Sequence, residues 1–347
     1  MPLATRSPAP ARPLTDRGAA VFRTYSPGLL VCAVAVAVAM AVGTLLPGVS
    51  PLIVAIILGI ALTNLLRLPD AVAPGITFAA KKLLRLGIVF LGLQLVLSDI
   101  LSLGWPMLLV IVCIVSGGIF GTLALGRLLK MRPAQVLLIA CGFSICGAAA
   151  VAGVEGVTDS DEEDVVTAVA LVVIFGTLMI PLIPVAGQLL GMNPELNGLW
   201  AGGAIHEIAQ VVAAGGVIGG GALAVAVIVK LSRVLLLAPV VAILSTRMRR
   251  AGQTSPNGKR PPIIPLFIIG FLAMIVLRST VELPASMLHA GGLLQTALLS
   301  AAMFGLGSGV KIRNLVRVGV RPFILASAST VLVAGIALAG VELAHLG

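Results

Sequence analysis

The chain has 347 residues, of which 59% are hydrophobic and only 10% are charged, and its formal net charge is +10. Soluble domains carry about 25% charged residues, so this composition excludes an ordinary soluble domain and indicates an all-α, polytopic membrane protein. Basic residues mark the cytoplasmic side of membrane proteins, so the positive charge predicts contact with membrane lipid and no nucleic-acid partner.

The first 27 residues are rich in Pro, Ala and Arg, which predicts a disordered cytoplasmic tail over residues 1–27. Residues 28–347 are expected to form one transmembrane domain. The first apolar run, Leu29 to Leu46, is longer than the roughly 7–15 residues of a signal-peptide core. We therefore expect this run to remain as a membrane helix.

Apolar runs separated by charges, Pro or Gly recur along the rest of the chain. A bilayer core about 30 Å thick needs roughly 20 apolar residues, so the runs predict about eleven transmembrane helices, or ten if the short third run does not span. The predicted helices cover residues 28–46, 51–66, 83–97, 105–126, 134–154, 165–187, 198–217, 222–246, 263–281, 292–310 and 322–343.

The basic residues support this division. With the N-terminus in the cytoplasm and the helices alternating in direction, nearly all of the 23 Lys and Arg residues fall in inner segments, as the positive-inside rule requires. The acidic cluster Asp159–Asp164 then falls outside, and so does the C-terminus.

Helix five contains the unusual stretch ACGFSICGAAAVAG, residues 140–153. Its glycines weaken a helix by about 1 kcal/mol each, so a break near Gly142, Ser144, Cys146 and Gly147 is predicted. A broken helix exposes amide N–H groups that can bind an anion. A packing seam of small residues is the alternative. A similar glycine interruption, FGLGSG at 304–309, lies in helix ten.

Helix seven contains GGAIHEIAQVV, in which His206, Glu207 and Gln210 stand in an otherwise apolar segment. Helix eight holds Lys230 and Arg233, which share one face. Lys230 lies about 13 Å deep at ~1.5 Å per residue. Ionisable groups at such depth are costly and usually functional. Glu207 could pair with either cation as a structural salt bridge, or all of these groups could form a transport site.

Together these groups are net positive and suit a small anion. Gly142, Ser144, Cys146, Gly147, Lys230 and Arg233 are the predicted substrate-binding residues, and His206, Glu207 and Gln210 the predicted coupling residues. A zinc hydrolase is a third alternative, but Gln210 replaces the second His of the H-E-x-x-H motif. We therefore predict no enzyme activity, no cofactor and no metal.

The stretches GFSICGAAAV, WAGGAIHEIAQVVAAG, IVKLSR and LLSAAMFGLG resemble the YeiH-type family of bacterial inner-membrane proteins. Members are often labelled sulfate exporters and are mostly uncharacterised. The resemblance covers the chain from about residue 28, although Ala149 replaces a Ser that is common in the family. It implies two inverted five-helix repeats with broken crossing helices, here residues 51–190 and 196–345, with helices five and ten as the broken pair.

The expected function is that of a secondary active transporter that exports sulfate or a related sulfur oxyanion or organosulfonate by alternating access. A cation–proton antiporter using Na⁺ or H⁺ at Glu207 is the alternative. No ATP-binding motif is visible in the sequence, so an ion gradient or the substrate's own gradient would supply the energy. Dimers are common among such transporters, which leaves a homodimer as an open alternative.

Overall fold

The computed structural model describes residues 14–46, 49–66, 68–155, 158, 160–250, 265–310 and 319–346. All regular elements in these ranges are helical. Six helices are long and apolar enough to cross a membrane, and shorter apolar helices lie among them; the six cover Arg23–Leu45, Gly104–Leu128, Glu163–Leu189, Ala222–Met248, Ala285–Gly309 and Val320–His345. This confirms an all-helical membrane protein.

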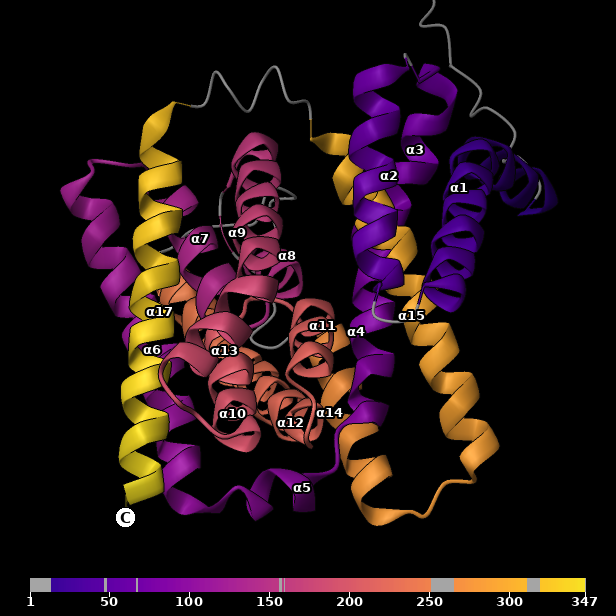
Figure 1. The fold of residues 1–347 in the computed structure, drawn as a ribbon. Helices are drawn as coiled ribbons and strands as arrows, with labels where there is room; N and C mark the ends of the chain where they lie inside the picture. The colour runs from indigo at the N-terminus through magenta and orange to yellow at the C-terminus, as the bar shows by residue number, and fades with distance from the viewer. Residues whose placement is uncertain are drawn as a thin grey trace, which may run out of the picture.

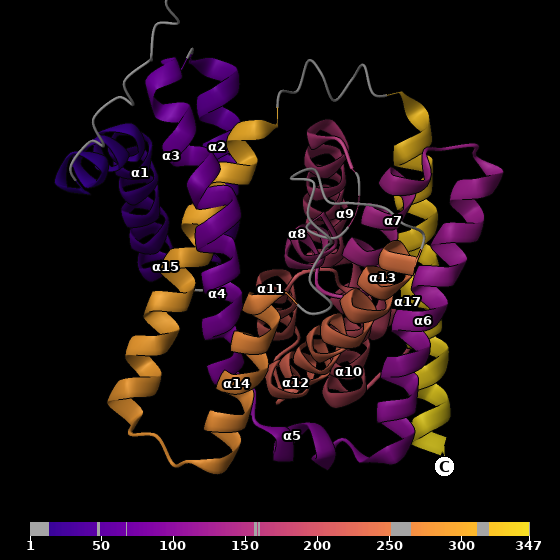
Figure 2. The same cartoon turned by 180° about the vertical axis from the view of Figure 1, so that it is seen from behind.

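The helices form two groups that lie side by side in both views (Figure 1, Figure 2). We call the first the scaffold group. It contains α1 (Leu14–Leu45), α2 (Pro51–Leu65), η1 (Asp70–Val72), α3 (Ala73–Phe78), η2 (Ala79–Leu83), α4 (Leu84–Leu91), η3 (Gly92–Gln94), α14 (Leu266–Thr280) and α15 (Ala285–Gly309).

We call the second the hairpin group. It contains α6 (Gly104–Leu128), α7 (Pro133–Ser144), α8 (Ala148–Glu155), α9 (Glu162–Leu189), α10 (Pro194–Ala204), α11 (Ile208–Ile218), α12 (Ala222–Leu235), α13 (Leu237–Arg250) and α17 (Val320–Leu346). The short helix α5 (Leu97–Ser102) connects the two groups along one edge (Figure 1).

Helix α1 begins at Leu14, inside the segment that the sequence predicted as a tail, and residues 1–13 lie outside the described residues. Pro27 is accommodated within the helix. Packing explains the difference, because a Cβ built on Gly28 would fall 2.7 Å from the Cα of Gly75, so α1 and α3 cross in close contact. The rings of Tyr25 and Phe78, 5.3 Å apart, extend this contact.

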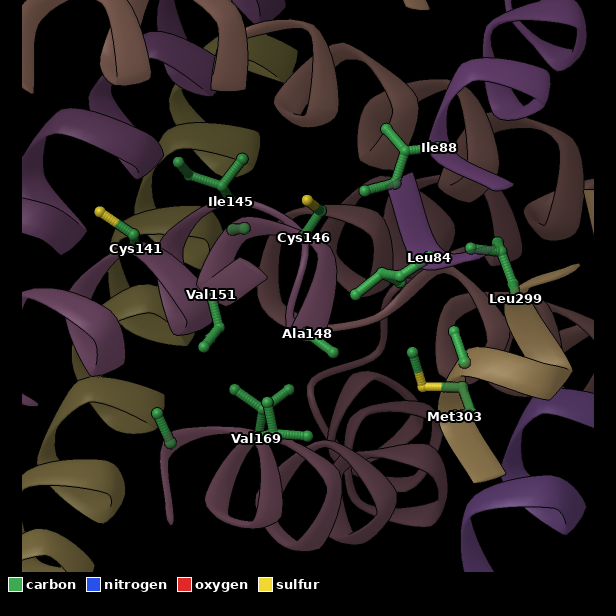
Figure 3. Close-up of a cluster of buried hydrophobic side chains, with 14 of the residues drawn as sticks. Leu84, Ile88, Cys141, Ile145, Cys146, Ala148, Val151, Val169, Leu299 and Met303 are labelled. Carbon is green, nitrogen blue, oxygen red and sulfur yellow. The ribbon is translucent and has the colours of Figure 1, made fainter. Parts of the chain in front are cut away.

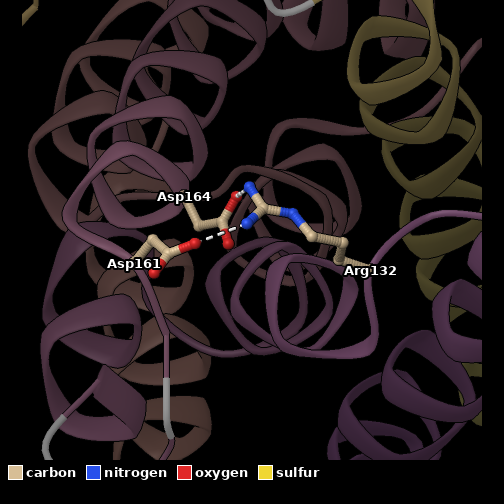
Figure 4. A network of polar contacts seen from close by, with 3 residues as sticks. All are labelled: Arg132, Asp161 and Asp164. Carbon is tan, nitrogen blue, oxygen red and sulfur yellow. Dashed lines mark hydrogen bonds and ion pairs between the residues drawn. The ribbon is translucent and has the colours of Figure 1, made fainter.

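Helices α7 and α8 form a hairpin that enters and leaves on the same face. Arg132, just before α7, forms ion pairs with Asp161 and Asp164 at the start of α9 (Figure 4). The two legs pack together, since a Cβ on Gly142 would meet the side chain of Val151 at 2.9 Å. The prediction that residues 134–154 cross the membrane is therefore wrong. Asp161 and Asp164 of the acidic cluster lie on the same face as Arg132, which we call the Arg132 face, and Asp159 lies outside the described residues.

Helices α10 and α11 form a second hairpin, which enters from the opposite face. A Cβ on Gly220, just after α11, would lie 2.9 Å from Pro194 at the start of α10, so both ends of this hairpin are adjacent. Asn197 packs against Gly187 near the end of α9, which lies far along α9 from Asp164. Residues 198–217 are therefore a hairpin and not a span.

These two hairpins explain why charge sorting did not reveal the error. A re-entrant hairpin adds no crossing, so two hairpins replace two predicted crossings and every later loop keeps its predicted side. The count of eleven crossings and the inverted repeats are not confirmed. The side of each loop relative to the cytoplasm remains a prediction of the positive-inside rule.

Helix α15 runs without a break from Ala285 to Gly309, so the predicted break in helix ten is wrong. Its glycines serve packing. A Cβ on Gly307 would lie 2.3 Å from the carbonyl oxygen of Ile56, and a Cβ on Gly59 would lie 2.3 Å from that of Phe304. Close backbone contact between α2 and α15 makes the scaffold group a tightly packed unit.

The two groups meet through an apolar layer (Figure 3). Leu84 and Ile88 of α4 and Leu299 and Met303 of α15 face the hairpin group. The α7–α8 tip and α9 contribute Cys146, Ala148 and Val169 to the same buried cluster. One ion pair, Lys81 of η2 with Glu155 of α8, joins the groups at the Arg132 face, with 3.4 Å between Nζ and Oε1.

Candidate functional site

The tips of the two hairpins meet inside the hairpin group. Between α7 and α8 the chain turns through Gly147, whose φ of +75° favours glycine. Between α10 and α11 it is extended, with ψ near +150° at Ile205 and Glu207. Ser144 lies against Gly118 in α6, and Gly203 lies close to Ile114 of the same helix, which places both tips near the middle of α6.

Arg233 binds the carbonyl ends of α7 and α10, the first helix of each hairpin. Its guanidinium donates to the carbonyl oxygens of Phe143 and Ser144 at the end of α7, with a shortest distance of 2.8 Å. It also donates to Gly202, Gly203 and Ile205 at the end of α10, with a shortest distance of 2.7 Å. Because the last carbonyls of a helix lack partners and carry partial negative charge, one Arg stabilises two helix ends.

Lys230 connects the same two ends one helical turn away. Its ammonium donates to the carbonyl oxygens of Ile145 at 2.8 Å and Ile205 at 2.9 Å. Both cations are fully buried. A buried charge is tolerated when hydrogen bonds replace its hydration, and here backbone carbonyls supply those bonds. The structure places both cations at the ends of α7 and α10, where their partners are protein carbonyls, and their role in binding substrate stays a prediction.

Glu207 lies at the amide ends of α8 and α11, the second helix of each hairpin. Its Oε1 accepts from the backbone N–H of Ala148, the first residue of α8, at 3.0 Å. Within its own hairpin it caps α11, where its side chain accepts from the Gln210 N–H and Gln210 Oε1 accepts from the Glu207 N–H at 3.1 Å. Within the described residues no ion pair joins Glu207 to Lys230 or Arg233, so the salt-bridge alternative is wrong in its partners.

Gly147 is required by this arrangement as well as by its own φ. A Cβ at this position would lie 2.4 Å from Cγ and 2.8 Å from Oε1 of Glu207. The missing side chain is the space that lets the carboxylate reach Ala148. Gln210 is held at the same level, because its Nε2 donates to the carbonyl oxygen of Val173 in α9.

His206 connects the tips to α17. Its Nδ1 lies 3.2 Å from the carbonyl oxygen of Phe143, and its Nε2 lies 3.1 Å from Oγ1 of Thr330. The imidazole also packs against the Phe143 ring in a tilted arrangement, with 4.4 Å between ring centroids. A carbonyl oxygen can only accept, so Nδ1 carries a hydrogen.

Three of the predicted binding residues have other roles. Gly142 lies within α7 and allows α8 to pack against it. The buried Ser144 hydroxyl has no hydrogen-bond partner among the described residues and points at α6, where a Cβ on Gly118 would lie 2.5 Å from it. Cys146 lies on the side of the tip that faces α4, among apolar side chains (Figure 3). None of these side chains points at the carboxylate.

A cavity of about 870 Å³ separates the two groups on the Arg132 face and reaches the first turn of α8. The scaffold group contributes Lys81 and Arg85 to its wall, and the hairpin group contributes Ala148, Ala152 and Glu155. A second cavity of about 340 Å³ lies between α5 and α12 and reaches Leu231, the residue after Lys230. The crossing of the hairpin tips lies between these two cavities.

Sequence reasoning missed the groups that satisfy the buried charges. The carbonyls of Phe143 and Ile145 have no sequence signal, because every residue has a carbonyl. Thr330 is one of several hydroxyl residues in an apolar helix, and nothing in its neighbours distinguishes it. Arg132 and Asp164 could have been found, because a basic residue that opens one helix and an acidic one that opens another within a short distance suggest one shared face.

Metal-binding potential is limited in the described part of the chain, where no group of three or more His, Cys, Asp or Glu residues is close enough to hold an ion. His289 and His345 lie exposed on α15 and α17. The ring nitrogens of His206 are occupied by Phe143 and Thr330.

Comparison with known proteins places the chain among membrane proteins. The family model described as conserved hypothetical protein 698 matches residues 27–326. A UPF0324 membrane protein of Corynebacterium glutamicum is 74% identical over 335 residues, covering 96% of this chain and 97% of its own length.

More distant relatives carry the same description. UPF0324 membrane proteins of Bacteroides thetaiotaomicron and Pseudomonas aeruginosa are each 39% identical, over 80% and 87% of this chain and over 84% and 89% of their own lengths. No solved structure matches. These similarities agree with the YeiH-type resemblance, and the names of these relatives state no substrate.

Proposed function

We propose, since the chain belongs to the family of conserved hypothetical protein 698, that it is a secondary transporter that exports a small anion. Sulfate, related sulfur oxyanions and organosulfonates are the first candidates. The proposed location is the bacterial inner membrane, with the N-terminus in the cytoplasm. The observation that carries the proposal is the convergence of two re-entrant hairpins on buried charges between two cavities.

The charge balance at the tips favours an anion. The carbonyl ends of α7 and α10 each carry about −0.5 elementary charge and the amide ends of α8 and α11 about +0.5, so the four helix ends cancel. Lys230 and Arg233 then face one carboxylate, that of Glu207, which leaves one net positive charge in a buried region. This positive charge would attract a small anion entering from the cavity at Ala148.

A cation site at Glu207 receives less support. The carboxylate is engaged by backbone N–H groups from two helices, and such donors stabilise negative charge without coordinating a metal cation. A Na⁺ ion would need several oxygen ligands, whereas the carbonyls nearest the tips already accept from Lys230 and Arg233. The antiporter alternative would require this network to rearrange first.

Alternating access would come from movement of the hairpin group against the scaffold group. Contacts between glycines and backbone atoms hold α2 and α15 together, while apolar side chains form most of the layer between the groups. Apolar layers without directional bonds can slide at low cost. The Lys81–Glu155 ion pair would then stabilise the state in which the cavity opens on the Arg132 face.

Proteoliposomes containing purified protein test the proposal. We expect uptake of isotopically labelled sulfate, sulfite or thiosulfate, which empty vesicles should not show. Vesicles with the Glu207→Gln variant should differ from the wild type in substrate affinity and in the pH dependence of uptake. Glu195→Gln is the matched control, because Glu195 lies in the same hairpin but is exposed. Absence of flux for every anion, with a response to Na⁺ pulses in a pH-dye assay, would instead favour the antiporter.

A further inference from the structure

The buried pair His206 and Thr330 has fewer hydrogen-bond donors than acceptors. Besides its contact with His206 Nε2 at 3.1 Å, the Thr330 hydroxyl lies 2.9 Å from the carbonyl oxygen of Ala326. His206 Nδ1 must donate to Phe143. One hydroxyl hydrogen therefore serves two acceptors, Nε2 and the Ala326 carbonyl, and can satisfy only one of them at a time.

Two protonation states fit the same heavy-atom positions. With a neutral ring, the hydroxyl donates to Nε2, because otherwise two lone pairs would face each other. With a proton on Nε2, the ring N–H donates to Oγ1 and the hydroxyl turns to the Ala326 carbonyl. Neither state leaves a buried donor without an acceptor, which is the usual obstacle to protonating a buried imidazole.

The charges around His206 decide which state is populated. Arg233 of α12 shares the Phe143 carbonyl with His206, and Lys230 binds the neighbouring carbonyls of Ile145 and Ile205, so both cations repel a further positive charge on the ring. The carboxylate of Glu207, the next residue in the chain, attracts one. From α7 the ring meets the Phe143 carbonyl, and from α17 the Thr330 hydroxyl. The two cations outweigh the single carboxylate, so the neutral ring fits the tips as they stand, and an added anion would offset the charge of a proton on Nε2.

We propose that Thr330 is a positioning residue that lets His206 take up one proton from water as one small anion enters the hairpin tips. With one proton on His206 and one divalent anion such as sulfate bound, the buried tips would then carry no net charge. By linkage, the anion strengthens proton binding as much as the proton strengthens anion binding. This inference rests on the proposed transport function and adds the coupling ion and the group that accommodates it.

Nitrogen NMR on labelled His206 tests the hydrogen-bond assignment without any transport. The chain has three His residues, so His289→Gln with His345→Gln leaves one signal. We expect a protonated Nδ1 and an unprotonated, hydrogen-bonded Nε2, and Thr330→Val should move the Nε2 resonance while Thr330→Ser restores it. A protonated Nε2 in the anion-free protein, or no response to Thr330→Val, would overturn the assignment.

Calorimetry in buffers of different ionisation enthalpy tests the coupling, with sulfate, sulfite and thiosulfate as probes. We expect about one proton taken up per bound anion in the wild type and in Thr330→Ser. Thr330→Val should weaken this protonation by about tenfold or more, because the new N–H has no acceptor.

Thr122→Val is the matched control for a lost buried hydroxyl, because Thr122 donates to Ser329 between α6 and α17, whereas the ring nitrogens of His206 contact Phe143 and Thr330. We expect it to keep the proton count of the wild type. Anion binding with an unchanged proton count and pH profile in Thr330→Val would refute the coupling. If none of the probes binds, the coupling and the transport proposal fail together, while the NMR result still decides the role of the hydroxyl.

Discussion

Gly147→Ala is the sharpest test of how the tips are held together. The substitution places a non-Gly residue at φ +75°, which costs about 1–2 kcal/mol. The new Cβ would lie 2.4 Å from Cγ of Glu207, so the side chain must withdraw and its bond to the Ala148 N–H is lost. A hydrogen bond to a charged group contributes about 1.5–3 kcal/mol, which gives a total of roughly 2.5–5 kcal/mol.

Gly191→Ala separates the two contributions. Gly191 has a φ of +73°, but a Cβ there would have no neighbour within 4 Å. This control should therefore lose only the backbone term, about 1–2 kcal/mol. The measurement is thermal unfolding of both variants in the same detergent, followed by anion uptake. Equal losses in the two variants would show that Glu207 does not hold the α8 amide end and would refute the described contact.

Three further predictions follow from neighbouring contacts. Arg233→Lys should lower the free energy of unfolding by about 3 kcal/mol or more, because an ammonium cannot reach carbonyls of both α7 and α10. The control Arg127→Lys, at an exposed position, should be close to neutral. A stable and active Arg233→Lys variant would contradict this role. Gly118→Ala should lower the melting temperature, because the new Cβ would lie 2.5 Å from the Ser144 hydroxyl. Adding Ser144→Ala, which removes that hydroxyl, should restore part of the loss. Additive effects in the double mutant would argue against the contact. Glu155→Gln should change stability by less than about 1 kcal/mol, because both partners of the ion pair with Lys81 are partly exposed. It should nevertheless change the rate at which a membrane-permeant thiol reagent labels Cys146, which lies between the two groups. An unchanged labelling rate would contradict the proposed role of this ion pair in stabilising one state.

Buried polar groups are easier to find from this sequence than the fold around them. His206, Glu207, Gln210, Lys230 and Arg233 were identified because an ionisable group in an apolar segment must find a partner inside the protein, and the structure brings these groups together. The partners could not be identified. The sequence leaves a carboxylate or a bound anion as the partner of the cations, while the structure supplies the carbonyls of helix ends, which become free only where a helix stops.

The two hairpins illustrate the same limit. A re-entrant pair such as α7 and α8 has the composition of one spanning helix, and the positive-inside rule counts it wrongly without any visible conflict when a second pair compensates. The contact between Arg132 and the start of α9 distinguishes a re-entrant hairpin from a spanning helix here. This contact joins two separate elements and is not visible in the composition of either. The glycines of α15 misled for a related reason, since glycine marks a helix break and a close helix contact equally well.

Composition and periodicity alone determined that this chain is an all-helical membrane protein and that a few polar groups are buried in it, because the cost of placing charge in lipid depends only on residue type and depth. The tertiary structure decided which segments turn back, which helix ends face each other and which atoms satisfy Lys230, Arg233 and Glu207. Those outcomes depend on backbone groups whose hydrogen-bonding capacity is freed by the fold itself and is the same for every sequence.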